Sequence, residues 1–84
     1  MEIPPTVSDL IRALVRALPG VRITEVGDHR HPEAVRFLWG GRKYRAKLIG
    51  GRAHASSIEG NFEVGDHESR AVEKRLNREV PGTS

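Results

Sequence analysis

The side chains best suited to chemistry are the cations that recur through residues 36–52. Six arginines and lysines occur in this stretch without a single acidic residue. Guanidinium and ammonium groups donate hydrogen bonds to phosphate oxygens, and one arginine can donate two at once. We therefore expect a nucleic-acid-binding surface that contacts phosphates, formed by Arg36, Arg42, Lys43, Arg45, Lys47 and Arg52.

The histidines offer a second kind of chemistry. The pentapeptide Glu-Val-Gly-Asp-His occurs at residues 25–29 and again at 63–67, each time after an alternating run. We interpret both copies as turns that close a strand, because Gly permits unusual backbone angles and Asp bonds the following backbone. Imidazole and carboxylate groups suit zinc or another transition metal, but the spacing fits no specific metal motif. His29, His31 and His67 are the candidate ligands, and we expect neither a metal nor another cofactor.

No complete set of catalytic groups accompanies these residues. The sequence has no cysteine, which excludes thiolate chemistry, disulfides and cysteine-bound zinc. It also lacks the glycine-rich phosphate loop and the dinucleotide fingerprint. His29 is the candidate for general acid–base chemistry on a phosphodiester, but no residue is identified as a nucleophile. We therefore expect a binding module rather than an enzyme.

A β-hairpin is predicted to position the cations. Two alternating runs flank Gly40 and Gly41, and a tight two-residue turn needs the positive φ angles that glycine adopts readily. Pairing about this turn places opposite one another Trp39 and Arg42, Phe37 and Tyr44, and Val35 and Ala46. One face is then apolar and aromatic, and burial of that face should hold the register. Because the aromatic rings belong to the core, stacking of bases on this sheet is not expected.

Two helices are predicted at the ends of the chain. Apolar residues at helical spacing predict a first helix that is capped by Thr6 and ended by Pro19 and Gly20. A thinner apolar stripe predicts a last helix over roughly residues 68–79, with Asp66 as its cap.

Further strands are predicted between the helices. Residues 21–26 alternate as a strand, residues 52–57 show little pattern, and residues 58–64 suggest a fourth strand interrupted at Gly60. The fold class is therefore predicted to be α+β. We expect a two-layer sandwich of order α-β-β-β-(β)-α, with both helices on one face of a small antiparallel sheet.

Length and composition are typical of one small globular domain. Residues 1–84 are enough for a single core, and residues 1–5 and 81–84 are expected to be flexible. No apolar run reaches the roughly 18 residues that span a bilayer. The N-terminal residues also lack the basic and apolar segments of a signal peptide. We expect a cytoplasmic protein without membrane contact.

The charges are segregated along the chain. Residues 36–52 carry only cations, whereas residues 59–68 carry four acids and no cation. A basic surface suits nucleic acid, and a two-stranded ribbon can enter the major groove, so a duplex is the favoured partner. The alternative is a protein-interaction or self-associating module, in which the basic hairpin meets an acidic protein surface or residues 59–68 of another copy.

A second alternative comes from a resemblance to known folds. The order helix, three strands, helix resembles the double-stranded-RNA-binding domain and the HicA toxins. The segment DLIRAL at residues 9–14 looks like the start of a HicA helix, and residues 27–29 fall where those ribonucleases carry a Gly-x-His turn. The resemblance covers about the first half of the chain, and residues 50–64 have no counterpart. It implies a small ribonuclease with His29 as its active histidine.

Overall fold

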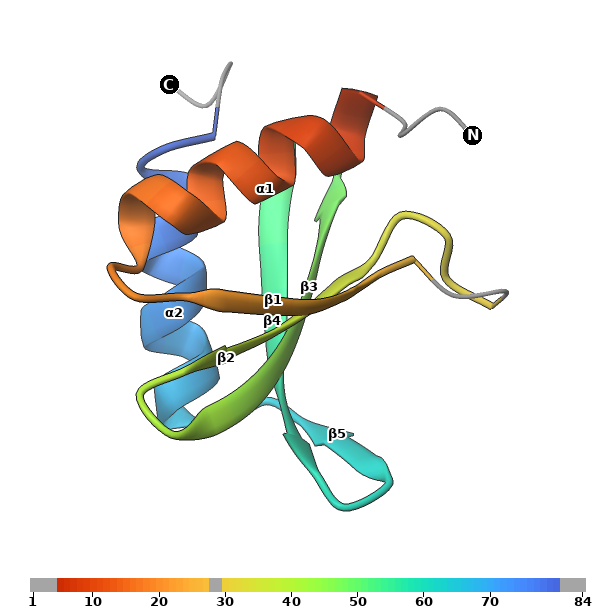
Figure 1. Ribbon diagram of the computed structural model, residues 1–84, viewed down its shortest axis with the longest axis vertical. Coiled ribbons are helices and arrows are strands. Elements are labelled where there is room, and N and C mark those ends of the chain that lie inside the picture. The colour runs from red at the N-terminus through yellow and green to blue at the C-terminus, as the bar shows by residue number, and fades with distance from the viewer. Residues whose placement is uncertain (1–4, 28–29, 81–84) are drawn as a thin grey trace.

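The computed structural model describes residues 5–27 and 30–80, which form two helices and a five-stranded sheet (Figure 1). The elements in chain order are α1 (Pro5–Ala17), β1 (Arg22–Val26), β2 (Val35–Trp39), β3 (Arg42–Ile49), β4 (Arg52–Glu59), β5 (Phe62–Val64) and α2 (His67–Asn77). Each strand pairs antiparallel with the next, so the sheet is a simple meander. Both helices pack on the sheet and on each other, which confirms the predicted α+β architecture.

The central hairpin has the predicted register. Strands β2 and β3 pair Trp39 with Arg42 and Phe37 with Tyr44, and they meet at a two-residue glycine turn. Gly40 and Gly41 have φ angles of 59° and 78°, the left-handed values that such a turn requires. Alternation along the two strands then sends Phe37 and Tyr44 into the core, where their rings stack at 5.4 Å between centroids.

The core is formed by one face of the sheet and the inner sides of the two helices. Helix α1 contributes leucines at helical spacing, and α2 contributes a thinner stripe, as predicted. The largest fully buried hydrophobic residues are Val7, Leu10, Leu14, Leu18, Val35, Phe37, Val72 and Leu76. Neither helix in the described part of the chain combines the length and the apolar character that crossing a membrane demands.

Helix α1 starts earlier than predicted. It begins at Pro5, so Thr6 lies inside its first turn and is not the cap. Proline suits the first turn because its φ angle is already helical and its missing N–H has no helical partner to lose. The prediction took Pro4 and Pro5 to disfavour helix and placed the start of the helix after them, which is wrong for Pro5.

Strand β4 corrects the prediction for residues 52–57, which form a full strand. The residues that face the helices are small, namely Ala53, Ala55 and Ser57, so hydrophobic alternation is weak although geometric alternation is intact. Small side chains allow α2 to approach this strand closely. Gly60 belongs to a turn that separates β4 from β5 and does not interrupt a single strand.

Side chains of α2 close the part of the β4 edge that β5 leaves uncovered. Asn77 accepts a hydrogen bond from the Ala53 amide at 2.8 Å and donates one to the Ala53 carbonyl at 3.1 Å. Glu73 accepts from the Ala55 amide at 2.9 Å. A helix thereby supplies the donors and acceptors that another strand would otherwise provide, and it protects an edge that could pair with other chains.

Candidate nucleic-acid interface

The strand register sorts the charged side chains onto two faces of the sheet. The face of the sheet that is turned away from the helices is called here the outer face. It carries Arg36, Lys43 and the residues that lie beside them in register on all five strands. Its charged residues are Arg22, Glu25, Arg36, Lys43, Arg45, Lys47, Arg52 and Glu63. Six cations and two acids give the outer face a net charge of +4, which exceeds the +3 of the whole sequence. The excess positive charge of the protein therefore lies on this face.

Five of the six predicted phosphate-binding residues lie on the outer face, and Arg42 does not. Arg42 stands opposite Trp39 on the helix side of the hairpin. Its guanidinium Nη2 lies 2.8 Å from Asp66 Oδ2 and 3.7 Å from Glu59 Oε1. The structure thus gives Arg42 a role within the fold, where it ties β3 to the start of α2.

Asp66 caps α2 as predicted and also gathers polar side chains around it. Its Oδ1 accepts hydrogen bonds from the Ser69 amide at 2.9 Å and from the Ser57 hydroxyl at 2.7 Å. The bond from the Ser69 amide, followed by that from Ser57, lowers the pKa of the Asp66 carboxyl below its usual value. Ser57 donates a hydrogen bond to a helix-capping carboxylate, so this cluster anchors α2 to the sheet.

Arg45 lies on the outer face but is held by its own chain. Its Nη2 is 2.8 Å from Glu63 Oε2, and only 13% of its side chain is exposed. The acidic residues 59–68 thus fold back onto cations of the same chain, with Glu59 and Asp66 at Arg42 and Glu63 at Arg45. The other exposed or half-exposed cations of the outer face are Arg22, Arg36, Lys43, Lys47 and Arg52.

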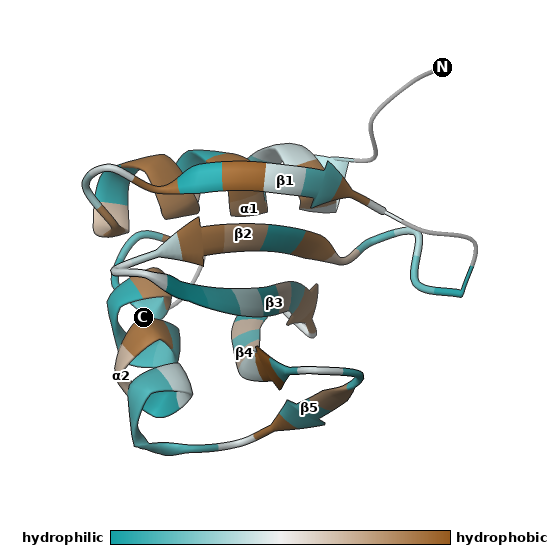
Figure 2. Cartoon of the chain, turned by 60° about the horizontal axis from the view of Figure 1, so that its bottom comes forward, coloured by the Kyte–Doolittle hydropathy of each residue, from teal (hydrophilic) through white to brown (hydrophobic). Residues whose placement is uncertain are grey.

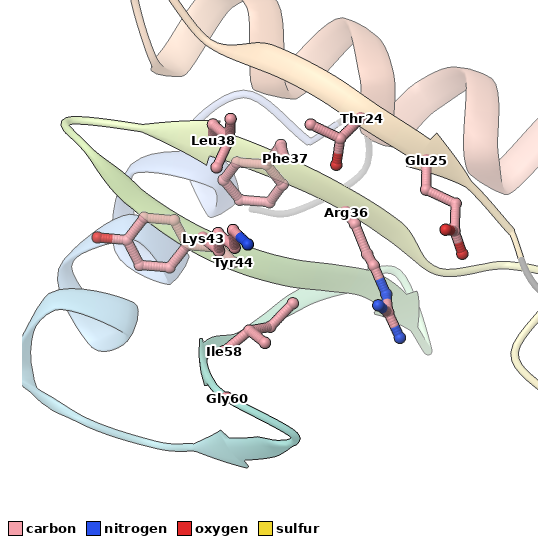
Figure 3. Close-up of a pocket in the computed structure, with 9 residues that line it drawn as sticks. All are labelled: Thr24, Glu25, Arg36, Phe37, Leu38, Lys43, Tyr44, Ile58 and Gly60. Atoms are coloured by element: carbon pink, nitrogen blue, oxygen red, sulfur yellow. The ribbon is translucent and has the colours of Figure 1, made fainter.

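A hollow of about 360 Å³ opens on the outer face between β1 and the β4–β5 turn. Its lining, shown in Figure 3, consists of Thr24, Glu25, Arg36, Phe37, Leu38, Lys43, Tyr44, Ile58 and Gly60. The aliphatic side chains of Leu38 and Ile58 stand among charged neighbours that arise from β1, β2 and β3. This hollow is called the outer groove below.

A β-bulge in β1 helps to build the outer groove. The pairing of β1 with β2 shifts by one residue between Ile23 and Glu25, so Glu25 rather than Thr24 stands opposite Arg36. Bulges turn side chains toward new directions and are common beside binding sites. Both Thr24 and Glu25 consequently reach the rim of the groove.

The histidines are not gathered into a metal site in the described residues. His31 lies in the connection after β1 and His67 is the first residue of α2, which follows β5. Strands β1 and β5 are the opposite edges of the sheet (Figure 2), so Gly27 after β1 and Gly65 after β5 belong to opposite edges. Within residues 5–27 and 30–80, no three His, Cys, Asp or Glu side chains could share a metal ion. His29 lies outside the described residues.

Three residues of the interface escaped sequence reasoning. The sequence prediction did not count Leu38 as part of the interface, and Ile58 could be placed on this face only once β4 was known. Glu25 reaches the groove through the bulge, which no sequence signal marks.

The chain matches no protein-family model, no curated protein and no solved structure, so its interface is interpreted from its own geometry.

Proposed function

We propose that this protein is a small nucleic-acid-binding module that contacts the phosphate backbone through the outer face of its sheet. The observation that carries the proposal is the charge of that face, +4 on a chain of net charge +3. Phosphates are neutralised by such surfaces with the release of bound counterions, which is the main source of affinity for nucleic acid. Lys43, Lys47 and Arg52 are the residues best placed for these contacts, with Arg36 beside them.

The width of the sheet favours contact along the backbone over entry into a groove of the duplex. Neighbouring strands are about 4.8 Å apart, so five strands span roughly 19 Å. The major groove of DNA is only about 12 Å wide. Strands β2 and β3 lie in the middle of the sheet and cannot enter that groove as a free two-stranded ribbon. The proposed contact is therefore a surface contact with little reading of base sequence.

The test compares two double variants that remove equal charge from opposite sides of the protein. Binding of a fluorescent 20-nucleotide strand and its duplex is measured by anisotropy from low to physiological salt. Lys43→Ala with Lys47→Ala should weaken binding and lower the log–log salt slope by about 1.4 to 1.8, because each phosphate contact contributes about 0.7 to 0.9. Arg12→Ala with Arg16→Ala alters exposed cations on α1 and should leave the slope unchanged.

Two results would overturn this proposal. One is the absence of binding to either nucleic acid at low salt. The other is an equal loss of affinity in both double variants, since this would mean that net charge attracts the nucleic acid and that no particular face binds it.

A further inference from the structure

We propose that the outer groove receives one nucleotide of a single strand, with the base on Leu38 and Ile58 and the adjoining phosphate on Arg36 and Lys43. This inference rests on the proposed function and narrows its partner from nucleic acid in general to an unpaired strand. The proposed partner is thus a single strand and not the duplex that the sequence analysis favoured. The argument depends on the size of the groove, on its apolar floor and on the position of its charges.

The size of the groove fits a ligand of one nucleotide. Its volume of about 360 Å³ is at the lower end of the range for small-molecule sites, which starts at roughly 300 Å³. A duplex stacks its bases on one another and turns only their edges outward, so it offers no base to such a hollow. Bases of a single strand can be splayed out and laid on a protein surface.

The groove contains two aliphatic side chains, one on each side of Lys43, on a face whose other residues are polar or charged except for Ile49. Leu38 stands directly opposite Lys43 in the sheet, and Ile58 follows on the far side of Lys43 in the next strand. Both apolar residues are half-buried. Contact with phosphate alone would need only charged or polar side chains. The face of a base is apolar, and laying it on Leu38 and Ile58 removes apolar surface from water. Aliphatic residues here take the place of the aromatic residues that other sheets use, since the aromatics of this hairpin are in the core.

The charges around this floor match the alternation of base and phosphate in a strand. Arg36 and Lys43 line the groove from β2 and β3, and both are exposed (Figure 3). Arg45 lies next to them on β3 and forms an ion pair with Glu63. Thr24 and Glu25 at the rim supply a hydroxyl and a carboxylate, which can bond the donors of a base or sugar but repel a second phosphate.

The experiment separates base contact from phosphate contact on the intact protein. Anisotropy is measured at one moderate salt concentration for a single strand, the matching duplex, and a strand of equal length and charge that has abasic sites in place of bases. The normal strand should bind most tightly. The uncharged substitution Ile58→Ser should weaken binding of the normal strand by about three- to tenfold, and it should leave the abasic strand unaffected.

A matched control lies on the same face. Ile49→Ser changes an equally aliphatic residue, 52% exposed and outside the groove lining, and it should not alter binding of any strand. Leu38→Ser provides a second variant of the floor, and a thermal melt of each variant shows that it is folded. A separate titration over several salt concentrations should give the same salt slope for all three variants as for the parent protein, because no charge is removed.

Three results would overturn the inference while leaving the proposed function intact. They are duplex binding as tight as single-strand binding, equal affinity for the normal and the abasic strand, or an unchanged affinity in both Leu38→Ser and Ile58→Ser. Displacement of the strand by an equal charge of poly-glutamate would also overturn it, because the groove would then recognise acidic chains of any kind. A failure of the proposed function is distinct, since no nucleic acid would then bind at low salt.

Discussion

Removal of the Asn77 side chain should destabilise the protein and open one edge of its sheet. Asn77 joins α2 to β4 by accepting from the Ala53 amide and donating to the Ala53 carbonyl. Its neighbour Glu73 accepts from the Ala55 amide one turn earlier in the helix. The variants Asn77→Ala and Glu73→Ala remove these bonds without changing the core side chains.

The expected magnitude follows from the number of bonds and the burial of their partners. A hydrogen bond contributes about 1 kcal/mol net, and a buried amide left without a partner costs about 1–3 kcal/mol. Ala53 is only 1% exposed, so Asn77→Ala should lower the free energy of unfolding by about 2–3 kcal/mol. Glu73→Ala should cost about 1–2 kcal/mol, because it breaks one bond to a less buried residue. For a domain of this size, each 1 kcal/mol lowers Tm by about 4–8 °C.

The assay combines urea denaturation with amide hydrogen exchange by NMR. Unfolding gives the free-energy differences, and exchange reports on the amides of Ala53 and Ala55 themselves. Glu73→Gln keeps an acceptor oxygen and should retain protection at Ala55, while Lys74→Ala changes an exposed residue of the same helix and should alter neither stability nor exchange. Asn77→Ala should expose the Ala53 amide to exchange before the protein unfolds globally.

The reasoning would be refuted if Asn77→Ala and Glu73→Ala both unfolded within about 0.5 kcal/mol of the Lys74→Ala control, the range usual for neutral surface substitutions. Unchanged protection at Ala53 and Ala55 in those variants would refute it independently, because other groups would then satisfy the two amides. A further consequence concerns association. An uncovered β4 edge offers unpaired amides and carbonyls, so the double variant should aggregate more readily than the parent protein.

Three more predictions follow from other contacts. The pKa of the Asp66 carboxyl is lowered in the folded state, so the stabilisation it provides is present above pH 3.8 and is lost as the pH falls below that value; urea titrations from pH 5 to 2 should show a smaller loss for Asp66→Asn. Burial raises the pKa of the Tyr44 hydroxyl above 10.0, so absorbance of this single tyrosine should titrate above that pH, and its contribution to stability should fade as the pH rises further. Gly27→Ala should destabilise more than Gly41→Ala in thermal melts. Both substitutions force alanine to positive φ at a cost of about 1–3 kcal/mol, but only at Gly27 would the new Cβ lie 2.7 Å from the Pro32 carbonyl oxygen.

The central hairpin was predictable because its signals are local. Gly40 and Gly41 define the turn, and alternation of large apolar residues defines the face, so the pairing of Phe37 with Tyr44 could be stated from sequence. Helix α1 was predictable for a similar reason, since its leucines repeat at helical spacing. In each case a single segment contains the whole pattern.

Strand β4 was less predictable because its residues that face the helices are small and give only a weak hydrophobic alternation. Ala53 and Ser57 are buried against α2, and nothing in the strand itself indicates that a helix will approach so closely. The acidic partners of Arg42 and Arg45 could not be predicted for a related reason. Arg42 meets Asp66 across 24 positions of sequence, and only the completed sheet brings them to 2.8 Å. The outer groove likewise depends on a bulge and on a strand that local patterns do not reveal.

The outer face brings cationic side chains next to one another in the sheet. Arg36 stands directly opposite Arg45 in the sheet, and like charges in that position destabilise a pair of strands by roughly 0.2–1 kcal/mol. Glu63 lies 2.8 Å from Arg45, and this ion pair reduces the repulsion between the two arginines. Lys43, which stands between Leu38 and Ile58, is an exposed cation where an apolar residue would extend the aliphatic patch. The net charge of +4 on this face is therefore the feature on which the proposed contact with a polyanion depends.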